Sequence, residues 1–202
     1  MTDNGGPMPV AIGSVCVFCG SSDEADPEFL TSARRFGELL AESGIRLVYG
    51  GGGVGLMGAC ARGANSAGGA VLGIIPEFLT SREQPFSDVE TVVVQTMHER
   101  KMQMFTASDA FVILPGGVGT LEEVVELLSW QRLGLHDKPI AFYSPRNFWQ
   151  PLFELFQHTI AERLTPASFS MAWRTTERLE ELLPLLTEMA ARGRSPSLPE
   201  LT

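Results

Sequence analysis

The sequence predicts an α/β fold in which a mostly parallel sheet carries helices on both faces. Its apolar runs are short, rich in β-branched residues and nearly continuous, as in strands that are covered on both faces. Segments with helical periodicity lie between these runs, so that strand and helix alternate along the chain. A chain of 202 residues with 44% hydrophobic residues has the size of one such domain.

The elements follow one another in a regular order. The strands are expected at residues 15–18, 47–49, 71–75, 92–94, 111–114 and 140–143. The helices are expected at residues 27–43, 56–67, 99–107, 120–133, 148–163 and 177–191. Because no repeat or long linker interrupts this order, we expect a single Rossmann-like domain over residues 10–192. Residues 1–9 and 193–202 have the Pro, Gly and Ser content of loose tails.

Composition and charge limit the partners that can be expected. A formal net charge of −9 leaves no basic stripe for a nucleic-acid backbone, so an anionic ligand has to be held by backbone amides and a few arginines. The amino-terminal stretch has no basic segment followed by an apolar one, and no apolar run is long enough to span a membrane. We therefore expect a cytoplasmic protein whose partners include neither nucleic acid nor a membrane.

The cysteines do not indicate a disulfide framework. There are three of them, an odd number, and Cys16 and Cys19 form a C-x-x-C within an expected strand. Side chains three residues apart on a strand point to opposite faces, which argues against a shared metal ion or a redox pair. Cys16, Cys19 and Cys60 are therefore interpreted as small buried thiols of the core.

Glycine-rich turns follow three of the expected strands. They are FCGSS after the first strand, which contains Gly20 and Ser21, VYGGGVGLMG after the second, and LPGGVGT after the fifth. In an open parallel sheet, ligands bind beyond the carboxyl ends of the strands, where the following helices begin. The sequence therefore predicts a ligand site built from these turns.

The second turn allows two interpretations. Residues 53–58 match G-x-G-x-x-G, and Glu77 follows at about the 20 residues expected of a dinucleotide fingerprint. That fingerprint normally follows the first strand of its unit, whereas a complete strand and helix precede this one. Glycines that allow a helix to pack closely on the sheet are an equally good explanation, and both interpretations stay open at this point.

The turn LPGGVGT is more specific for an anion. Its consecutive backbone N–H groups, from Gly116 to Gly119, suit a phosphate, and Thr120 adds a hydroxyl at the helix start. It lacks the G-K-[ST] ending of a nucleoside triphosphate loop, so no lysine is placed to reach a β- or γ-phosphate. A monophosphate is the expected ligand.

The glutamate that follows this turn also has two interpretations. Thr120 and Glu123 have the spacing of a capping box, in which Glu123 would bond the amide of Thr120. Alternatively, Glu123 faces the part of the ligand beyond the phosphate, and Arg100 offsets its charge. Arg100 belongs to TMHERKMQM, a charged cluster at an expected helix start, where cations are unfavourable with the helix dipole and a functional reason is favoured.

Taken together, these motifs resemble those of a known family. The segments CGSS, GGGxxGLMG, M-H-x-R-K, P-G-G-x-G-T-x-x-E and W-x-x-L-G-x-H-x-K-P are similar to those of the Lonely Guy family, the cytokinin riboside 5′-monophosphate phosphoribohydrolases. The resemblance covers roughly residues 15–156. It implies hydrolysis of the N-glycosidic bond of AMP or of an N6-modified AMP, which gives the free base and ribose 5-phosphate. It implies no metal and no organic cofactor.

The resemblance also implies roles for individual residues. Arg100 and Glu123 match the catalytic pair, and the turn from Gly116 to Thr120 matches the phosphate cradle. Glu83, in LTSREQPF, corresponds to a family glutamate when one gap is allowed. The residues expected to bind the substrate are Gly20, Ser21, Glu83, Met97, Lys101, Gly116, Gly117, Val118, Gly119, Thr120, Glu122 and Ser129.

Two other functions remain to be weighed. An older label of this family, lysine decarboxylase, would require pyridoxal phosphate on a Schiff-base lysine, and the chain offers only Lys101 and Lys138. A nucleotide or molybdenum-cofactor carrier on the same fold would bind without hydrolysis, but it has no need of a carboxylate that faces a sugar. Hydrolysis of a nucleoside 5′-monophosphate is therefore the expected function.

A homodimer is the expected assembly. The segment ELLSWQRLGLH places Trp130, Leu133 and Leu135 on a helix and its end, which gives this region more apolar surface than one sheet face requires. The family that the sequence resembles also pairs through this neighbourhood. Packing against the sheet alone is the alternative explanation.

Overall fold

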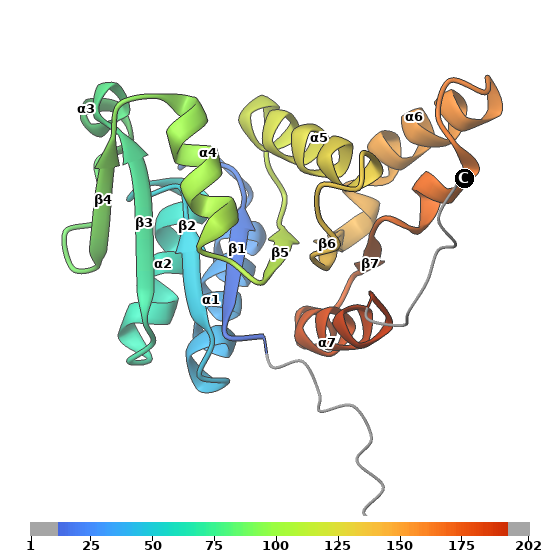
Figure 1. The fold of residues 1–202 in the computed structure, drawn as a ribbon. Coiled ribbons are helices and arrows are strands. Elements are labelled where there is room, and N and C mark those ends of the chain that lie inside the picture. Colours follow the sequence, from blue (N-terminus) through green and yellow to red (C-terminus); the bar gives the residue numbers. More distant parts are fainter. Residues whose placement is uncertain (1–11, 194–202) are drawn as a thin grey trace, which may run out of the picture.

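The computed structural model describes residues 12–193 and shows a parallel sheet between two layers of helices (Figure 1). The seven strands are arranged in the order β4-β3-β2-β1-β5-β6-β7. They are β1 (Ser14–Phe18), β2 (Arg46–Tyr49), β3 (Val71–Pro76), β4 (Glu90–Val94), β5 (Ala110–Ile113), β6 (Ile140–Tyr143) and β7 (Arg174–Thr176). The α-helices are α1 (Pro27–Glu42), α2 (Gly55–Ser66), α3 (Thr80–Glu83), α4 (Met97–Thr106), α5 (Val118–Arg132), α6 (Gln150–Ala161) and α7 (Leu182–Gly193). The predicted α/β architecture is confirmed.

The differences from the predicted elements have local causes. The short helix α3 and the strand β7 were not predicted, because four and three residues are too few to show a periodicity. The last helix begins at Leu182 instead of residue 177, after a 3₁₀ turn, and Pro184 lies in its first turn, where a missing N–H is tolerated. The predicted tails, residues 1–9 and 193–202, lie outside the described residues, except for Gly193, which ends α7.

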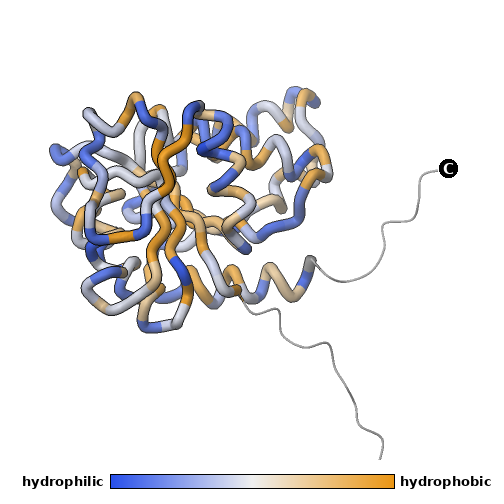
Figure 2. The backbone as a smooth tube through the Cα atoms, turned by 60° about the vertical axis from the view of Figure 1, so that its left-hand side comes forward, coloured by the Kyte–Doolittle hydropathy of each residue, from blue (hydrophilic) through white to orange (hydrophobic). Residues whose placement is uncertain are grey.

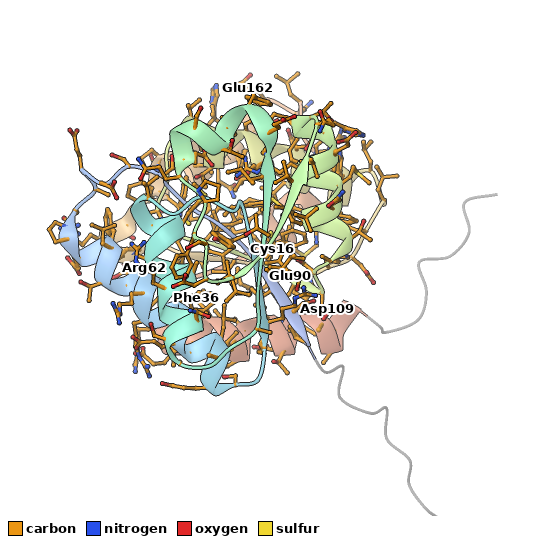
Figure 3. All side chains as sticks on the ribbon, turned by 90° about the vertical axis from the view of Figure 1, so that its left-hand side faces the viewer. Cys16, Phe36, Arg62, Glu90, Asp109 and Glu162 are labelled. Atoms are coloured by element: carbon orange, nitrogen blue, oxygen red, sulfur yellow. The ribbon has the colours of Figure 1, made fainter. Side chains whose placement is uncertain are left out.

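The central strand β1 contributes to two cores, because successive side chains point to opposite faces. Val15 and Val17 of β1 pack with α1, α2 and α7, whereas Cys16 and Phe18 pack with α4, α5 and α6. Figure 2 shows that the most apolar segments run through the centre of the molecule. In Figure 3, Cys16 lies among the packed side chains of the interior and Glu162 lies at the surface. This double coverage explains why the strands read as continuous apolar runs.

The cysteines lie where the sequence predicts them. Cys16 and Cys19 belong to the cores on opposite faces of the sheet, and Cys60 is buried on α2. All three thiols are free, and burial raises the pKa of each. Among residues 12–193, no cluster of His, Cys, Asp and Glu side chains is arranged to hold a metal ion. No helix in this range is long and apolar enough to cross a membrane.

The strand order places a crevice at one edge of the sheet. Successive strands are added on one side of β1 up to β4, and then on its other side from β5 to β7 (Figure 1). The connections that leave β1 and β5 therefore diverge, and a crevice opens between them. The two glycine turns meet there, because the amide of Gly20 donates to the carbonyl of Pro115 at 3.0 Å. The topology thus determines where a ligand can bind.

Close packing of α1 on α2 supports this side of the crevice. A Cβ atom on Gly37 of α1 would lie 2.0 Å from the carbonyl oxygen of Cys60 on α2. Phe36, the neighbour of Gly37 that is labelled in Figure 3, is completely buried in the core that includes α1 and α2. Only glycine allows the two helix backbones to approach this closely.

Substitution of this glycine provides a test of the packing. We expect Gly37→Ala to lower the free energy of unfolding by about 1–3 kcal/mol, because the methyl group overpacks the interface. Gly119→Ala is the matched control, since its methyl group would meet open space. The higher helix propensity of alanine should stabilise this variant by about 1 kcal/mol. Urea unfolding measures both variants, and equal stabilities would contradict the predicted contact.

Candidate active site

A crevice of about 300 Å³ lies beyond the carboxyl ends of β1 and β5. It is formed by the turn after β1, the start of α2, the end of α3, the second turn of α4 and the first two turns of α5. Its lining residues are Cys19, Gly20, Ser21, Ser22, Met57, Glu83, Arg100, Gly117, Val118, Gly119, Thr120 and Glu123. The volume is in the range of a small-molecule site.

The amino-terminal end of α5 offers free backbone donors to this crevice. The helix begins at Val118, and Gly117, in an extended conformation, is its N-cap without any side-chain cap. Within the described residues, the amides of Val118, Gly119 and Thr120 donate to no protein acceptor. Unpaired amides at the positive end of a helix dipole are a binding site for an anion. The glycine turn thus offers free donors to an anion, and a monophosphate as that anion stays a prediction.

The capping-box interpretation of Thr120 and Glu123 is wrong. Because Gly117 already turns the chain into the helix, α5 begins two residues before Thr120, and both residues lie inside it. Glu123 therefore cannot reach back to an N-cap amide. The same T-x-x-E spacing does cap α4, where the hydroxyl of Thr96 accepts from the amide of Glu99 at 3.1 Å. Glu123 is left free to face the crevice.

The dinucleotide-fingerprint interpretation is also not supported. The amide of Gly55, at the start of α2, donates to the carboxylate of Asp23 at 2.7 Å. The next two amides, of Leu56 and Met57, lie 3.0 and 3.3 Å from the carbonyl oxygen of Gly20. The first turn of α2 is therefore occupied by protein acceptors and offers no donors to a phosphate. Its glycines serve close packing, and α5 carries the open anion site.

Arg100 is a buried cation held in place by backbone carbonyls. Its guanidinium donates to the carbonyl oxygens of Ile74 at 3.2 Å and Gly50 at 3.0 Å, and the residue is only 5% exposed. A Cβ atom on Gly50 would lie 2.0 Å from Nη2 of this guanidinium, so a larger residue there would displace the Arg100 side chain. Nη1 lies 3.8 Å from a carboxylate oxygen of Glu123, and Nη2 lies 3.9 Å from one of Glu83. Arg100 therefore lies between two carboxylates at the floor of the crevice.

The two carboxylates are unusual in their protonation. Burial raises the pKa of Glu123 to about 7, although the attraction of Arg100 opposes this shift. Glu122 and Glu83 raise the pKa of Glu123 further, and Lys101 lowers it. Burial also raises the pKa of Glu83, whose Oε2 receives no hydrogen bond from any described residue. A carboxyl group that titrates near neutral pH in a crevice is a common feature of catalytic sites.

The structure brings together most of the residues predicted to form the site. Those that line the crevice are Gly20, Ser21, Glu83, Arg100, Gly117, Val118, Gly119, Thr120 and Glu123. Gly116 lies directly behind this lining, because a Cβ atom there would be 2.2 Å from the hydroxyl of Thr120. The half-buried Met97, at the start of α4, does not line the crevice. Contact of these two residues with a substrate stays a prediction.

Lys101, Glu122 and Ser129 lie outside the crevice of a single chain. The ammonium of Lys101 pairs with Glu122 at 2.5 Å and with Glu126 at 2.8 Å, so it links α4 to α5 and does not point at the ligand site. Glu122 is exposed, and with Ser129 it lines a separate, open hollow on the outer face of α5. The predicted contacts of these residues with a substrate are untested.

Three lining residues were not among the predicted site residues. Cys19 and Ser22 flank the predicted Gly20 and Ser21 in the turn after β1, and Met57 comes from the second glycine-rich motif. The glycine turns indicated this edge of the sheet. Which side chains between the glycines reach the crevice depends on how α2 packs on the sheet, and the sequence alone does not reveal it.

Comparison with known proteins gives a consistent result. Residues 57–186 match the model of a protein family described as "Possible lysine decarboxylase". A probable cytokinin riboside 5′-monophosphate phosphoribohydrolase of Oryza sativa subsp. japonica is 42% identical over 172 residues, which cover 85% of this chain and 77% of that protein. A cytokinin riboside 5′-monophosphate phosphoribohydrolase of Rhodococcoides fascians is 42% identical over 160 residues, with 78% and 81% covered.

Solved structures with the same fold include proteins of a different function. The molybdenum cofactor binding protein of Rippkaea orientalis is 25% identical, with a TM-score of 0.66 over 89% of this chain and 98% of the other. The molybdenum cofactor carrier protein of Chlamydomonas reinhardtii is 19% identical, with a TM-score of 0.68 over 90% and 99%. At 19% identity the likeness shows only a common fold.

Because the pKa of Glu123 is raised in the folded protein, we expect the contribution of Glu123 to the free energy of unfolding to depend on pH. The fold favours the protonated carboxyl, so the stability that it contributes is full below pH 4.5 and is lost as pH rises through about 7. We therefore expect Glu123→Gln, which cannot ionise, to gain about 2–3 kcal/mol relative to the parental protein between pH 5 and pH 8. Urea unfolding at both pH values measures this gain. The same stability difference at pH 5 and pH 8 would contradict it.

Proposed function

This chain belongs to the Lonely Guy family of cytokinin riboside 5′-monophosphate phosphoribohydrolases, and we propose that it hydrolyses the N-glycosidic bond of a nucleoside 5′-monophosphate. The substrate is AMP or an N6-modified AMP, and the products are the free base and ribose 5-phosphate. One observation carries this proposal: the Arg100–Glu123 pair lies directly behind the open anion site of α5.

The spacing along α5 fits a nucleotide. The free amides of Val118, Gly119 and Thr120 hold the 5′-phosphate at the start of the helix. Glu123 lies about one helical turn, roughly 5 Å, further along the same helix, and residues three or four positions apart share a face. When the phosphate occupies the amides, the carboxylate of Glu123 can reach the ribose. Binding of the phosphate thereby orients the sugar for reaction.

The chemistry explains why a carboxylate is needed behind an anion site. As the bond between C1′ and the base nitrogen breaks, positive charge develops on the ribose, and ionised Glu123 stabilises this charge or orients the attacking water. The water oxygen forms the new bond to C1′, and its proton balances the negative charge of the departing base. Arg100 keeps Glu123 more acidic than burial alone would allow, so that the ionised form is present near neutral pH.

A lysine decarboxylase does not fit this arrangement. A Schiff base with pyridoxal phosphate needs a lysine at the reaction site. Lys101 is engaged by Glu122 and Glu126, and the ammonium of Lys138 donates to the carbonyl oxygens of Phe105 and Ser108. The chain has no further lysine, and neither of these two lines the crevice.

A carrier without catalytic activity is the second candidate, since molybdenum cofactor proteins have the same fold. A carrier for an anionic ligand would gain nothing from a carboxylate beside its anion site. Glu123 is 9% exposed and has a pKa of about 7, so its ionised form destabilises the fold at neutral pH. Retention of such a group is explained by hydrolysis and not by binding alone.

The role of Glu123 can be tested by an isosteric substitution. We expect Glu123→Gln to lower the turnover of AMP on the order of a hundredfold or more, because it removes the charge that stabilises the transition state. Binding of AMP should persist or improve slightly, because a carboxylate near a phosphate is repulsive in the ground state. Chromatography of released adenine and titration calorimetry measure the two effects. Adenine release at the parental rate by a folded variant would overturn the assignment.

Arg100→Ala should also lose activity, because Glu123 then lacks the cation that keeps it ionised. The same chromatographic assay of adenine release applies. If this variant retained the parental rate while Glu123→Gln did not, the two residues would not act as a pair.

Recognition of the phosphate should dominate substrate choice. Adenosine cannot use the free amides of α5, and each charge-assisted hydrogen bond contributes about 1.5–3 kcal/mol. We therefore expect kcat/KM for adenosine to be at least about a hundredfold below that for AMP, since two such bonds amount to that factor. Parallel assays of the two compounds measure the ratio, and comparable values would contradict a phosphate site at α5.

We further propose that the active protein is a homodimer that pairs through α5. Val118 is 84% exposed, Val125 48%, and Leu133 and Leu135, at the end of the helix, 59% and 68%. Val118 lines both the crevice and the outer hollow that contains Glu122 and Ser129, so a partner on this face would lie at the mouth of the crevice. Pairing would thus bring the outlying predicted residues close to the substrate.

Light scattering tests the assembly at micromolar concentration, where we expect twice the mass of one chain. Val125→Glu places a charge on the exposed face of α5 and should produce a monomer. A parental protein that scatters as a monomer would contradict the dimer.

A further inference from the structure

The segment that follows α5 has no role in the crevice. It contains the second half of the motif W-x-x-L-G-x-H-x-K-P and leads into β6. His136 and Lys138 of this segment are half-buried, and neither side chain lines the crevice. Both nevertheless make specific hydrogen bonds to the helices that carry the proposed catalytic pair.

His136 ties the segment to α5. Its Nε2 lies 3.0 Å from the carbonyl oxygen of Leu127, and its Nδ1 lies 3.2 Å from the amide nitrogen of Lys138. A carbonyl can only accept and an amide N–H can only donate, so the ring carries its proton on Nε2 and is neutral. Burial lowers the pKa of His136, which keeps the ring in this form. The imidazole therefore acts as a fixed bridge.

Lys138 ties the same segment to α4. Its ammonium donates to the carbonyl oxygens of Phe105 at 2.6 Å and Ser108 at 2.7 Å, where α4 ends. It also lies 4.0 Å from the centre of the Phe105 ring, whose edge-on neighbours are His136 and Trp130. A cation at the carboxyl-terminal end of a helix is favoured by the helix dipole, and the carbonyl oxygens there accept hydrogen bonds from the ammonium.

These contacts lie close to the catalytic pair along each helix. Phe105 follows Arg100 on α4 by little more than one turn, roughly 8 Å, and Leu127 follows Glu123 on α5 by about one turn, roughly 6 Å. Next to the pair, the ion pairs of Lys101 with Glu122 and Glu126 join the same two helices. The two helices are therefore linked both beside the 3.8 Å contact between Arg100 and Glu123 and further along each helix.

We propose that Lys138 is a positioning residue which, through the clasp that it forms with His136, fixes the separation of Arg100 and Glu123. The clasp holds the end of α4 and Leu127 of α5 against one segment, so the two helices cannot shift independently. This inference rests on the proposed hydrolysis for its functional meaning. Its structural content, the distance between the guanidinium and the carboxylate, can be measured without any activity.

Two other roles for Lys138 predict different experimental outcomes. A lysine that only stabilises the fold would affect the amount of folded protein and not the properties of Glu123 in the folded fraction. A lysine that contacts the substrate would change KM, but its ammonium is directed at carbonyls at the opposite end of α4 from the crevice. Only positioning predicts a changed environment of Glu123 together with unchanged phosphate binding.

The experiment follows the titration of the Glu123 carboxyl carbon by NMR in the full-length protein, with the signal assigned by its loss in Glu123→Gln. In Lys138→Met, which keeps the aliphatic chain and removes the donors, we expect the midpoint to move to higher pH. The reason is that Arg100 lowers the pKa of Glu123, and its attraction weakens with distance. We also expect kcat for AMP to fall roughly tenfold or more, with KM changed by less than about threefold.

Two further variants complete the design. Lys138→Arg retains a cation with several donors and should restore most of the parental midpoint and kcat. Leu186→Ala, in the buried face of α7 on the other side of the sheet, is a destabilising control that should leave both quantities unchanged. If Lys138→Met does not fold, His136→Phe removes the bridge to α5 and keeps the ring, and its midpoint should shift in the same direction.

The outcomes separate this inference from the proposed function. A shifted Glu123 midpoint with lowered kcat supports positioning, and a midpoint equal to that of Leu186→Ala overturns it. If the parental protein releases no free base from AMP or from an N6-prenylated AMP, the proposed hydrolysis fails. The NMR titration of the same variants then still decides whether Lys138 fixes the distance between Arg100 and Glu123.

Discussion

The burial of the Arg100 guanidinium is the constraint on which the site depends. Two backbone carbonyls accept its hydrogen bonds, and the carboxylates of Glu83 and Glu123 lie just under 4 Å away on either side. Burial raises the pKa of both carboxyl groups, and the attraction of this one cation offsets only part of the shift. A positive charge that develops on a bound sugar would balance the excess negative charge of the two carboxylates. The buried carboxylate of Glu123 thus lowers the stability of the fold and provides a reactive group in the crevice.

The fold supplies this arrangement through its topology. The reversal of strand order at β1 opens the crevice, and the helices that follow the strands point their first turns into it. Two of these helix starts are glycine-rich, but they are used differently. The start of α2 is closed by Asp23 and the carbonyl of Gly20, whereas the start of α5 keeps its amides free. A single anion can therefore bind in only one of the two places, next to Glu123.

The same fold also occurs in molybdenum cofactor proteins, so the sheet and its crevice do not determine the chemistry. The chemistry depends instead on a small number of side chains on α4 and α5 and on the contacts that hold these helices together. Lys101 links α4 to Glu122 and Glu126 of α5, and Lys138 and His136 tie the end of α4 and Leu127 of α5 to one segment. Both lysines of the chain are used in this way, which also explains why neither is available for a Schiff base.

The sequence by itself determined the positions of β1 to β6, because β-branched runs covered on both faces carry a strong local signal, and it predicted a phosphate site at Gly116–Thr120, which stays a prediction. It did not determine which T-x-x-E motif caps a helix. Thr96 caps α4, but Thr120 lies inside α5, since the backbone of Gly117 starts that helix earlier. It also could not show that Asp23 closes α2 or that Glu83 meets Arg100. Only the tertiary structure decided these points, because hydrogen bonding, burial and pKa depend on partners that are distant in sequence.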